Sequence, residues 1–228
     1  MKVILNLVVL VCFVANLSQA QDRPDPNVPQ GVNFEVPEGW QVRLDHEMED
    51  AIIGSKLDSS DVYFVNMTPG WHITTGPAGI FYHPSNTASG TFGIKTELHF
   101  FNPGDRNREG YGLFWGGSNL DGDAQAYMYF LLRNTGEFLI KKRIGENTEV
   151  VKEWTASDAI VKYGDNEESS VLNVLQVMVD EENVSFYIND EKAATVSAQG
   201  INSDGIFGLR VNHSVNLHIS DLALAQRD

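Results

Sequence analysis

The chain of 228 residues contains almost no cysteine. Its single cysteine, Cys12, lies inside an apolar run near the N-terminus. A lipoprotein signal would need a small residue just before this cysteine, where Val11 stands, so lipidation is disfavoured. If the run is removed on export, no thiol remains, which excludes thiol catalysis and disulfide cross-links. The stability of the remaining chain must then come from its hydrophobic core, which roughly 200 residues are long enough to bury.

Basic residues are also scarce. The chain has 16 Lys plus Arg against 31 Asp plus Glu, which gives a formal net charge of −15 at pH 7. Nucleic acids bind through Lys and Arg that displace counterions from phosphates, so this charge balance argues against a nucleic-acid partner. It argues equally against anionic membrane surfaces, and it favours solubility outside the cell.

Long apolar runs are missing after the first 15 residues. Lys2 precedes the apolar run Val3–Ala15, and Ser18 and Ala20 occupy the minus-three and minus-one positions of a cut before Gln21. This pattern predicts a secretory signal peptide over residues 1–20. The alternative, a membrane anchor, requires about 20 apolar residues to cross a bilayer. We therefore expect a secreted or periplasmic protein with no stable membrane insertion.

The region after the predicted cut is rich in proline. Residues 22–31 read DRPDPNVPQG and hold three prolines, which is typical of an extended segment. No low-complexity segment or repeat follows. We therefore expect an extended lead-in over 21–33 and a single domain over 34–228, a length that suits one large all-β unit. The sequence sets no expectation for the oligomeric state.

Helix signals are few, and strand signals are many. A turn or two of helix is expected only at 45–53 and 156–160. Along residues 91–101 (TFGIKTELHFF) apolar side chains alternate with polar ones, which is typical of a half-buried strand. The same pattern predicts strands at Val62–Asn66, Tyr111–Trp115, Ala124–Arg133, Glu137–Ile144, Asn173–Val179, Asn183–Ile188, Gly205–Val211 and Val215–Leu224.

Two short polar links join consecutive predicted strands. They are Asn134-Thr135-Gly136 and Asn189-Asp190, and both consist of residues that tolerate positive φ. Both are expected to close antiparallel hairpins. Ten or more strands with almost no helix predict an all-β antiparallel sandwich or barrel.

The second half of the chain resembles a known superfamily. The segments NVLQVMVDEENVSFYINDEKAATV and DGIFGLRVNHSVNLHISDLAL look like the closing strands of a concanavalin A-like jelly roll, in its lectin/glucanase and laminin-G-like branches. Residues 70–115 resemble the front half, with a W-x-I strand and a later G-Y-G-L-F-W, and the keto-disaccharide hydrolase-like branch is similar. The resemblance covers residues 62–224. It implies a two-sheet jelly-roll sandwich and, for function, a domain that acts on or binds carbohydrate.

The catalytic motif of the glucanases in this superfamily is missing. Their Glu-x-Asp-x-(x)-Glu strand places two carboxylates on one face, about 5 Å apart, for a retaining mechanism. The nearest cluster here, Glu47-Met48-Glu49-Asp50, has the wrong order and equally fits a solvated acidic loop. The chain has no H-E-x-x-H, no G-x-S-x-G and no dinucleotide-binding glycine motif either. The sequence thus leans against an enzyme without excluding one.

A metal site is suggested at one loop. In GSNLDGDAQ, Asp121 and Asp123 offer oxygen ligands of the kind that calcium prefers. They supply two or three of the roughly six to eight oxygens that a full site needs. A tight Asp-Gly turn is the alternative interpretation. Calcium is therefore a candidate cofactor, and no other cofactor is indicated.

Basic and aromatic residues in the predicted strands suggest a binding face. Lys141 and Arg143 share one face of their strand with Leu139, and Arg210 alternates with apolar neighbours. On the outer face of a jelly-roll sheet, aromatic rings can stack on sugars while Arg and Asn bind hydroxyls or carboxylates. Cross-strand ion pairs are the alternative role for these side chains. The candidate ligand-binding residues are His72, Tyr82, Trp115, Arg133, Arg143, Arg210, Asn212 and His213.

The stretch TPGWHITTGPAGIFYHP supplies two of these candidates. Trp71 and Ile73 should face the core, which leaves His72 on the other face of its strand. If the glycine- and proline-rich turn at 76–79 returns the chain beside this strand, His72 and Tyr82 would flank one groove. A histidine there could act as a base or bind a hydroxyl, although a structural hydrogen bond is equally consistent with it.

Three functions remain open. The first is glycan recognition without catalysis on the outer face of one sheet. The second is a sugar-active hydrolase or lyase of the keto-disaccharide type, with His72 or His213 as the base. The third is an adhesion module that binds another protein, which would require an exposed apolar patch of a few hundred Å².

Overall fold

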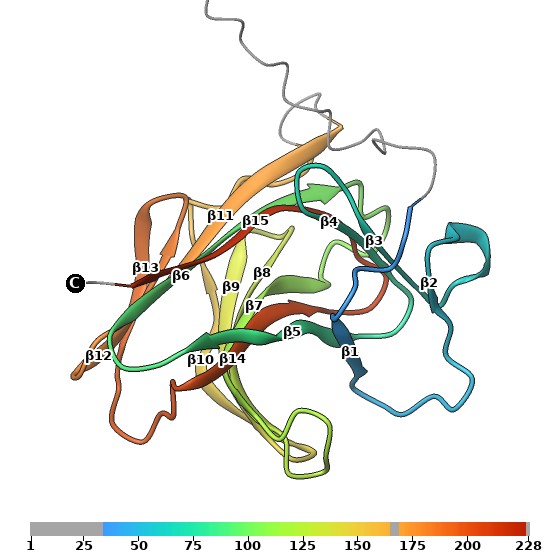
Figure 1. The fold of residues 1–228 in the computed structure, drawn as a ribbon. Helices are drawn as coiled ribbons and strands as arrows, with labels where there is room; N and C mark the ends of the chain where they lie inside the picture. Colours follow the sequence, from blue (N-terminus) through green and yellow to red (C-terminus); the bar gives the residue numbers. More distant parts are fainter. Residues whose placement is uncertain (1–33, 165–168, 227–228) are drawn as a thin grey trace, which may run out of the picture.

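The computed structural model describes residues 34–164 and 169–226, and side chains as far as Leu224. The predicted signal peptide and the lead-in at 21–33 lie outside this part. The described chain forms two β-sheets that pack face to face (Figure 1). This is the predicted all-β jelly-roll sandwich. Among the described residues, no helix is long and apolar enough to span a membrane.

The first sheet has seven strands. Its spatial order is β1 (Gln41–Leu44), β5 (Gly79–Ala88), β14 (Gly205–Val211), β7 (Gly110–Ser118), β8 (Ala126–Arg133), β9 (Glu137–Ile144) and β10 (Asn147–Ala156). All of its pairings are antiparallel. Of the strands in this sheet, β14 comes last in the sequence, yet it lies in the interior of the sheet, between β5 and β7. Segments far apart in sequence therefore meet in the middle of this sheet (Figure 1).

The second sheet has eight strands. Its order is β13 (Glu191–Ser197), β12 (Asn183–Ile188), β11 (Ser170–Val179), β6 (Phe92–Phe101), β15 (Asn216–Gln226), β4 (Trp71–Thr75), β3 (Val62–Asn66) and β2 (Ile53–Gly54). The short strand β2 pairs with β3 in parallel, and the other pairings are antiparallel. A 3₁₀ turn at Leu57–Ser59 follows β2.

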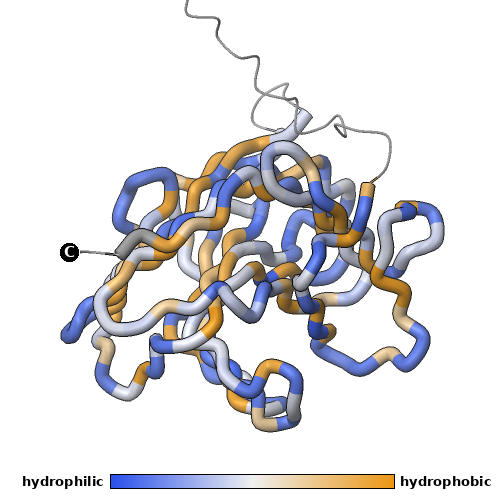
Figure 2. The backbone as a smooth tube through the Cα atoms, viewed as in Figure 1, coloured by the Kyte–Doolittle hydropathy of each residue, from blue (hydrophilic) through white to orange (hydrophobic). Residues whose placement is uncertain are grey.

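The main core fills the space between the two sheets. Along many strands, hydrophobic residues are interspersed with hydrophilic ones (Figure 2). Phe100 of β6 stacks on Tyr111 of β7 with ring centroids 4.5 Å apart, so this pair joins the two sheets. Phe130 contacts Phe186 across the same space, at 5.2 Å. Each fully buried ring of this kind contributes roughly 1.5–3 kcal/mol relative to exposure. This core, without any cross-link, holds the sandwich together.

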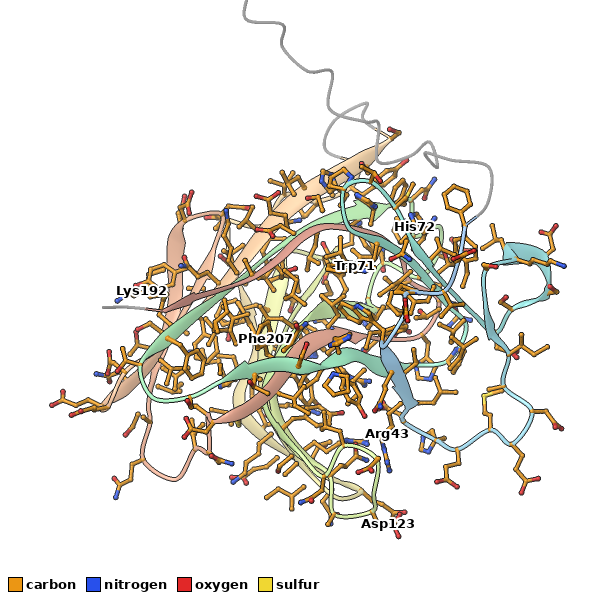
Figure 3. All side chains as sticks on the ribbon, viewed as in Figure 1. Arg43, Trp71, His72, Asp123, Lys192 and Phe207 are labelled. Carbon is orange, nitrogen blue, oxygen red and sulfur yellow. The ribbon has the colours of Figure 1, made fainter. Side chains whose placement is uncertain are left out.

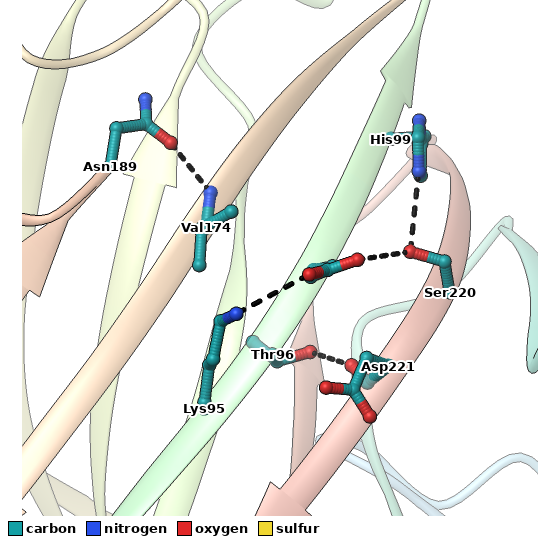
Figure 4. A network of polar contacts seen from close by, with 8 residues as sticks. Lys95, Thr96, His99, Val174, Asn189, Ser220 and Asp221 are labelled. Atoms are coloured by element: carbon teal, nitrogen blue, oxygen red, sulfur yellow. Dashed lines mark hydrogen bonds and ion pairs between the residues drawn. The ribbon is translucent and has the colours of Figure 1, made fainter.

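Both predicted hairpins are present. Arg133 pairs with Glu137 across the turn that contains Gly136, whose φ is +82°. Asn189 and Asp190 have φ values of +49° and +67° and join β12 to β13. Asn residues tolerate this left-handed region better than most. The Asn189 side chain also accepts a hydrogen bond from the Val174 backbone N–H at 2.7 Å, which fixes the turn against β11 (Figure 4).

Three expectations about local structure were wrong. Residues 45–53 and 156–160 contain no helical turn, and β10, which was not predicted, follows β9 directly. The chain after Gly76 does not return beside β4 either. It crosses to the other sheet, where β5 pairs with β1 and β14. The long-range partners of β5, which sequence spacing does not reveal, decide its position.

Candidate functional site

The outer face of the seven-stranded sheet carries a second cluster of buried side chains. Such a face is often polar and solvated, because the sheet needs to bury only one side. Here its middle is instead covered by apolar and aromatic groups. We call this surface the groove face, and its buried cluster consists of Ile80, Tyr82, Phe114, Leu120, Tyr127, Tyr129, Leu131 and Leu139.

An ion pair lies on the groove face at the end of β1. Side chains alternate along β1, so Val42 and Leu44 pack toward the main core while Arg43 and Asp45 face outward. The guanidinium of Arg210, on β14, donates two hydrogen bonds to the Asp45 carboxylate, at 2.9 and 2.6 Å. This two-pronged geometry is the strong form of a charge-assisted hydrogen bond.

A second arginine approaches the same carboxylate. Arg143 of β9 lies 3.8 Å from Asp45 Oδ1, which is an ion-pair distance without a direct hydrogen bond. The Arg143 and Arg210 side chains are only 11% and 8% exposed. Two largely buried cations therefore share one carboxylate, so this group of three side chains has one positive charge in excess.

Two cavities adjoin at this cluster, and both are lined by Asp45 and Arg143. The larger has a volume of about 650 Å³ and is also lined by Arg43, Leu44, His46, Glu47, Asp123, Gln125 and Glu146. The smaller has a volume of about 310 Å³ and is also lined by Ala78, Tyr129, Leu131, Leu139, Lys141, Thr148, Trp154, Arg210, Asn212 and His213. Both volumes fall in the range of roughly 300–1,000 Å³ that is typical of small-molecule sites.

Three tyrosines, Tyr82, Tyr127 and Tyr129, belong to the buried cluster of the groove face. Burial raises the pKa of Tyr129 to about 12, although the nearby Arg210 opposes this shift. Burial also raises the pKa of Tyr127 and of Tyr82. These phenols are therefore protonated at neutral pH and can act as hydrogen-bond donors or acceptors, not as bases.

Several buried polar atoms on the groove face have no protein partner. Arg210 Nε, Arg43 Nε and Asn212 Oδ1 are buried without a hydrogen bond. Arg210 and Asn212 both line the smaller cavity, although these two atoms are themselves shielded from solvent. Leaving such groups unpaired costs free energy unless a ligand or water completes them.

Six of the eight predicted ligand-binding residues lie on the groove face or at its border. Arg143, Arg210, Asn212 and His213 line cavities there, and Tyr82 belongs to the buried cluster. The sixth, Arg133, stands at the end of β8. It bonds to Glu137 and lies 4.1 Å from the centroid of the Trp154 ring, so it supports the wall of the smaller cavity.

Trp115 was wrongly placed on the binding face. Its side chain is fully buried between the sheets, 5.6 Å from Phe186 by ring centroids, and its indole N–H donates to Ser203 Oγ at 3.4 Å. In β7 the side chains of Tyr111, Leu113 and Trp115 face the main core, and the side chain of Phe114 faces the groove. Every residue of GYGLFWGG is buried, so the alternation did not reveal which face was the core.

His72 was also wrongly grouped with the arginines. It stands on β4, on the outer face of the eight-stranded sheet, away from Arg43 and Asp123 (Figure 3). There it faces His218 of β15, which in turn faces His99 of β6. We call these three residues the histidine row. Its neighbouring rings lie 6.2 Å and 5.6 Å apart.

Two members of the histidine row have a lowered pKa. His72 Nε2 donates to Asn216 Oδ1 at 2.7 Å, and burial lowers the pKa of His72. Burial, together with His99 and His72, lowers the pKa of His218 to about 4. Beside it, Ser220 links His99 to Glu97, and Glu97 pairs with Lys95 (Figure 4). A base at His72 therefore could not act on a ligand in the groove.

The structure does not assemble a metal cluster around the calcium candidates. Among residues 34–164 and 169–226, no group of three or more His, Cys, Asp or Glu side chains is arranged to hold a metal ion. Asp121 and Asp123 lie in the β7–β8 loop, where the Gly122 N–H donates to the Asn119 carbonyl at 3.1 Å in a tight turn. Asp123 also lines the larger cavity.

The sequence interpretation missed several groove residues. Asp45 was assigned to a helical turn, although the alternation of Gln41–Asp45 already places Arg43 and Asp45 on one face. Tyr129 occupies the same face of its strand as Arg133, so the period of two could have identified it. Trp154 lies on β10 (Asn147–Ala156), a strand that was not predicted.

Comparison with known proteins shows the fold. No protein-family model matches the sequence, and none of the curated proteins matches it. The structure is similar to the carbohydrate-binding module CBM66 from Bacillus subtilis, with a TM-score of 0.58, 11% identity and coverage of 84% of this chain and 97% of the other. It is also similar to a Bacillus subtilis protein of unknown function with a galectin-like fold. The TM-score there is 0.56 and the identity 12%, with coverage of 82% of this chain and 89% of the other.

A third similar structure is the Bacillus licheniformis beta-glucanase, with a TM-score of 0.53, 12% identity and coverage of 86% of this chain and 98% of the other. All three are concanavalin A-like jelly rolls. At these identities the similarity shows the fold alone. The chain has the concanavalin A-like jelly-roll fold that its sequence resembled.

Proposed function

We propose that this protein binds a glycan on the groove face. The observation that carries the proposal is the smaller cavity, whose lining combines the aromatic side chains of Tyr129 and Trp154 with hydrogen-bonding side chains, among them Asn212. Ring faces suit the C–H faces of a sugar, while amide and guanidinium side chains suit its hydroxyls.

The similar structures support a carbohydrate ligand. One is named as a carbohydrate-binding module and another as a beta-glucanase, and both share the arrangement of two sheets. Their fold does not fix the ligand of this chain, so the proposal depends on the cavity. We further propose that the protein is exported after cleavage between Ala20 and Gln21, which N-terminal sequencing of the exported protein would test.

The test is a glycan-array screen of the purified protein followed by titration with any glycan that binds. The variant Asn212→Ala removes an amide side chain that lines the smaller cavity and should weaken binding about tenfold, the effect of one lost hydrogen bond of roughly 1.4 kcal/mol. The matched control is Asn183→Ala on β12, in the other sheet, which should leave affinity unchanged. Absence of binding across neutral and acidic glycans would contradict the proposal and favour a protein partner instead.

A sugar-active hydrolase or lyase is the second candidate. Four carboxylates, those of Asp45, Glu47, Asp123 and Glu146, line the larger cavity, and His213 lines the smaller one. Paired carboxylates are the groups that glycoside hydrolysis requires. Incubating the protein with each glycan that binds, and separating the products by chromatography, distinguishes turnover from binding. Products that disappear in Asp123→Asn or Glu146→Gln would establish an enzyme.

A further inference from the structure

We propose that the sugar held in the smaller cavity carries an anionic group, such as the carboxylate of a uronic acid. This inference rests on the proposed function and specifies its ligand class. It follows from how charge is distributed between the two cavities, and from which charged groups there already have partners.

The smaller cavity has the opposite charge balance from the chain as a whole. The protein carries a formal charge of −15, with nearly twice as many acidic as basic residues. Yet the charged side chains that line this cavity are three cations, Lys141, Arg143 and Arg210, and one carboxylate, Asp45. Counting Lys, Arg, Asp and Glu alone, the wall of the cavity has two positive charges in excess. A low-dielectric wall concentrates the field of such charges on a bound ligand.

The one carboxylate is already fully used. Both oxygens of Asp45 accept hydrogen bonds from Arg210. Arg143 lies 3.8 Å from the nearer oxygen, so its fork of donors is not engaged by Asp45 in hydrogen bonds. Lys141 has no ion pair with any acidic side chain in the described part of the chain. Arg143 and Lys141 therefore remain available to an anion, and a planar guanidinium suits a carboxylate in particular.

The arrangement of Lys141 within β9 supports a role in the groove. Lys141 lies opposite Tyr129 in the sheet, and Arg143 lies opposite Tyr127. The two cations therefore lie beside two tyrosines of the buried cluster. The next residue, Lys142, alternates to the other side of β9 and does not line either of the two groove cavities. It lines a third, much smaller cavity with Met128 and Asn202, which Arg143 and Tyr127 border as well. The strand thus places two of its three consecutive basic side chains on the groove face.

The larger cavity has the reverse balance. Four carboxylates line it against Arg43 and Arg143, so an anionic group there would be repelled. A ligand that extends through both cavities would place its acidic sugar beside Lys141 and a neutral sugar beside Glu47 and Asp123. The two cavities together therefore favour an isolated or terminal acidic sugar over a chain that is acidic at every unit.

The experiment is a set of titrations of the purified protein, followed by Trp fluorescence or ligand-observed NMR. The probes are methyl β-glucuronide, methyl β-glucoside and glucose 6-sulfate, each at low and at physiological salt. We expect the glucuronide to bind at least tenfold more tightly than the glucoside, with a preference that shrinks as salt screens the charges. Lys141→Met should reduce this preference severalfold, and Lys142→Met, which removes the same charge one residue away, should not.

Each outcome separates the inference from the function on which it rests. Equal affinity for the glucoside and the glucuronide would overturn the inference and leave glycan binding intact. Binding of the sulfate without the glucuronide would retain an anionic ligand but overturn the uronic acid as its example. If no probe binds and the array shows only neutral glycans, the inference is wrong. If the array shows nothing, both proposals fail.

Discussion

The outer faces of the two sheets bury polar side chains in different ways. On the seven-stranded sheet, Asp45, Arg143 and Arg210 bury full charges beside aromatic rings, and two adjoining cavities open between them. On the eight-stranded sheet, the imidazoles of the histidine row lie directly opposite one another, and burial lowers the pKa of His72 and His218. A buried charge needs a partner at every pH of interest, whereas a buried imidazole can simply lose its proton.

This difference separates a surface suited to ligands from one suited to packing. The groove face keeps its cations charged beside two cavities, which is costly for folding and useful for binding. The histidine row instead reduces the cost of burial by staying neutral, and its effect should appear in stability at low pH. Variants on the two faces should therefore change different measured quantities.

The largest expected effect comes from breaking the ion pair of the groove face. Arg210→Met leaves the Asp45 carboxylate, 17% exposed, without its bidentate partner. Removing one member of a buried pair costs about 3 kcal/mol in the free energy of unfolding, and Arg143 offsets only part of it. Glycan binding should be lost as well. Urea unfolding and titration measure the two quantities separately.

The double variant Asp45→Asn with Arg210→Met distinguishes charge from shape. It removes both charges, so stability should recover partly while binding stays absent. The matched control on the other sheet is Lys95→Met, which breaks an exposed pair with Glu97. That change should cost less than about 1 kcal/mol and leave binding intact. A loss of stability in Lys95→Met as large as in Arg210→Met would contradict the distinction between the two faces.

The second effect is a loss of stability in acid that originates in the histidine row. In the folded protein the pKa of His218 is lowered to about 4, against about 6.5 for an unperturbed histidine. Between these values the unfolded chain binds more protons than the folded chain, so stability falls as pH decreases through this window. The free energy of unfolding should drop by about 2 kcal/mol from pH 7 to pH 5 through this residue.

Urea unfolding of His218→Gln at both pH values tests this assignment. The variant should lose most of the drop, because the buried imidazole is gone. His46→Gln provides the control, since His46 is exposed and lies outside the row. An unchanged pH dependence in His218→Gln would show that the acid sensitivity arises elsewhere. Affinity for a glycan should depend on pH much less than stability does, since no member of the row lines a groove cavity.

The third effect concerns the aromatic walls. Trp154→Ala removes a ring that lines the smaller cavity and lies under Arg133. We expect affinity to fall about tenfold, while stability falls by about 1 kcal/mol through the lost cation–π contact. Tyr187→Ala is the matched control, because it removes a ring that contacts Lys192 at 5.5 Å on the other sheet. Affinity in this control should stay unchanged, and a tenfold loss there would contradict the assigned site.

The sequence predicted the fold well because the fold depends on local patterns. Alternation located most strands, and Asn134–Gly136 and Asn189–Asp190 correctly indicated two hairpins. The site depends on strand order, which no local pattern encodes. β14 comes near the end of the chain yet lies between β5 and β7, and this position brings Arg210 to Asp45.

The same reasoning explains the two misplaced residues. Trp115 was assigned to the groove because a strand with apolar residues on both sides gives no sign of which side is the core. His72 was assigned to the groove because the turn after β4 was expected to return the chain to its own sheet, and it crosses to the other one. In both cases the alternation along the strand was correct, and the long-range assignment of its faces was not.

The smallest expected effect is that of metal removal. Asp123 reaches the larger cavity, but the charged contacts of the smaller cavity, at Lys141, Arg143 and Arg210, require no metal to be in place. Adding EDTA should therefore change glycan affinity less than about twofold, well under the tenfold effect of one lost hydrogen bond of roughly 1.4 kcal/mol. Titration with calcium and with EDTA measures this directly. Loss of binding in EDTA, reproduced by Asp121→Asn or Asp123→Asn, would instead establish calcium in the β7–β8 loop, and would make that loop, beside the larger cavity, the centre of recognition.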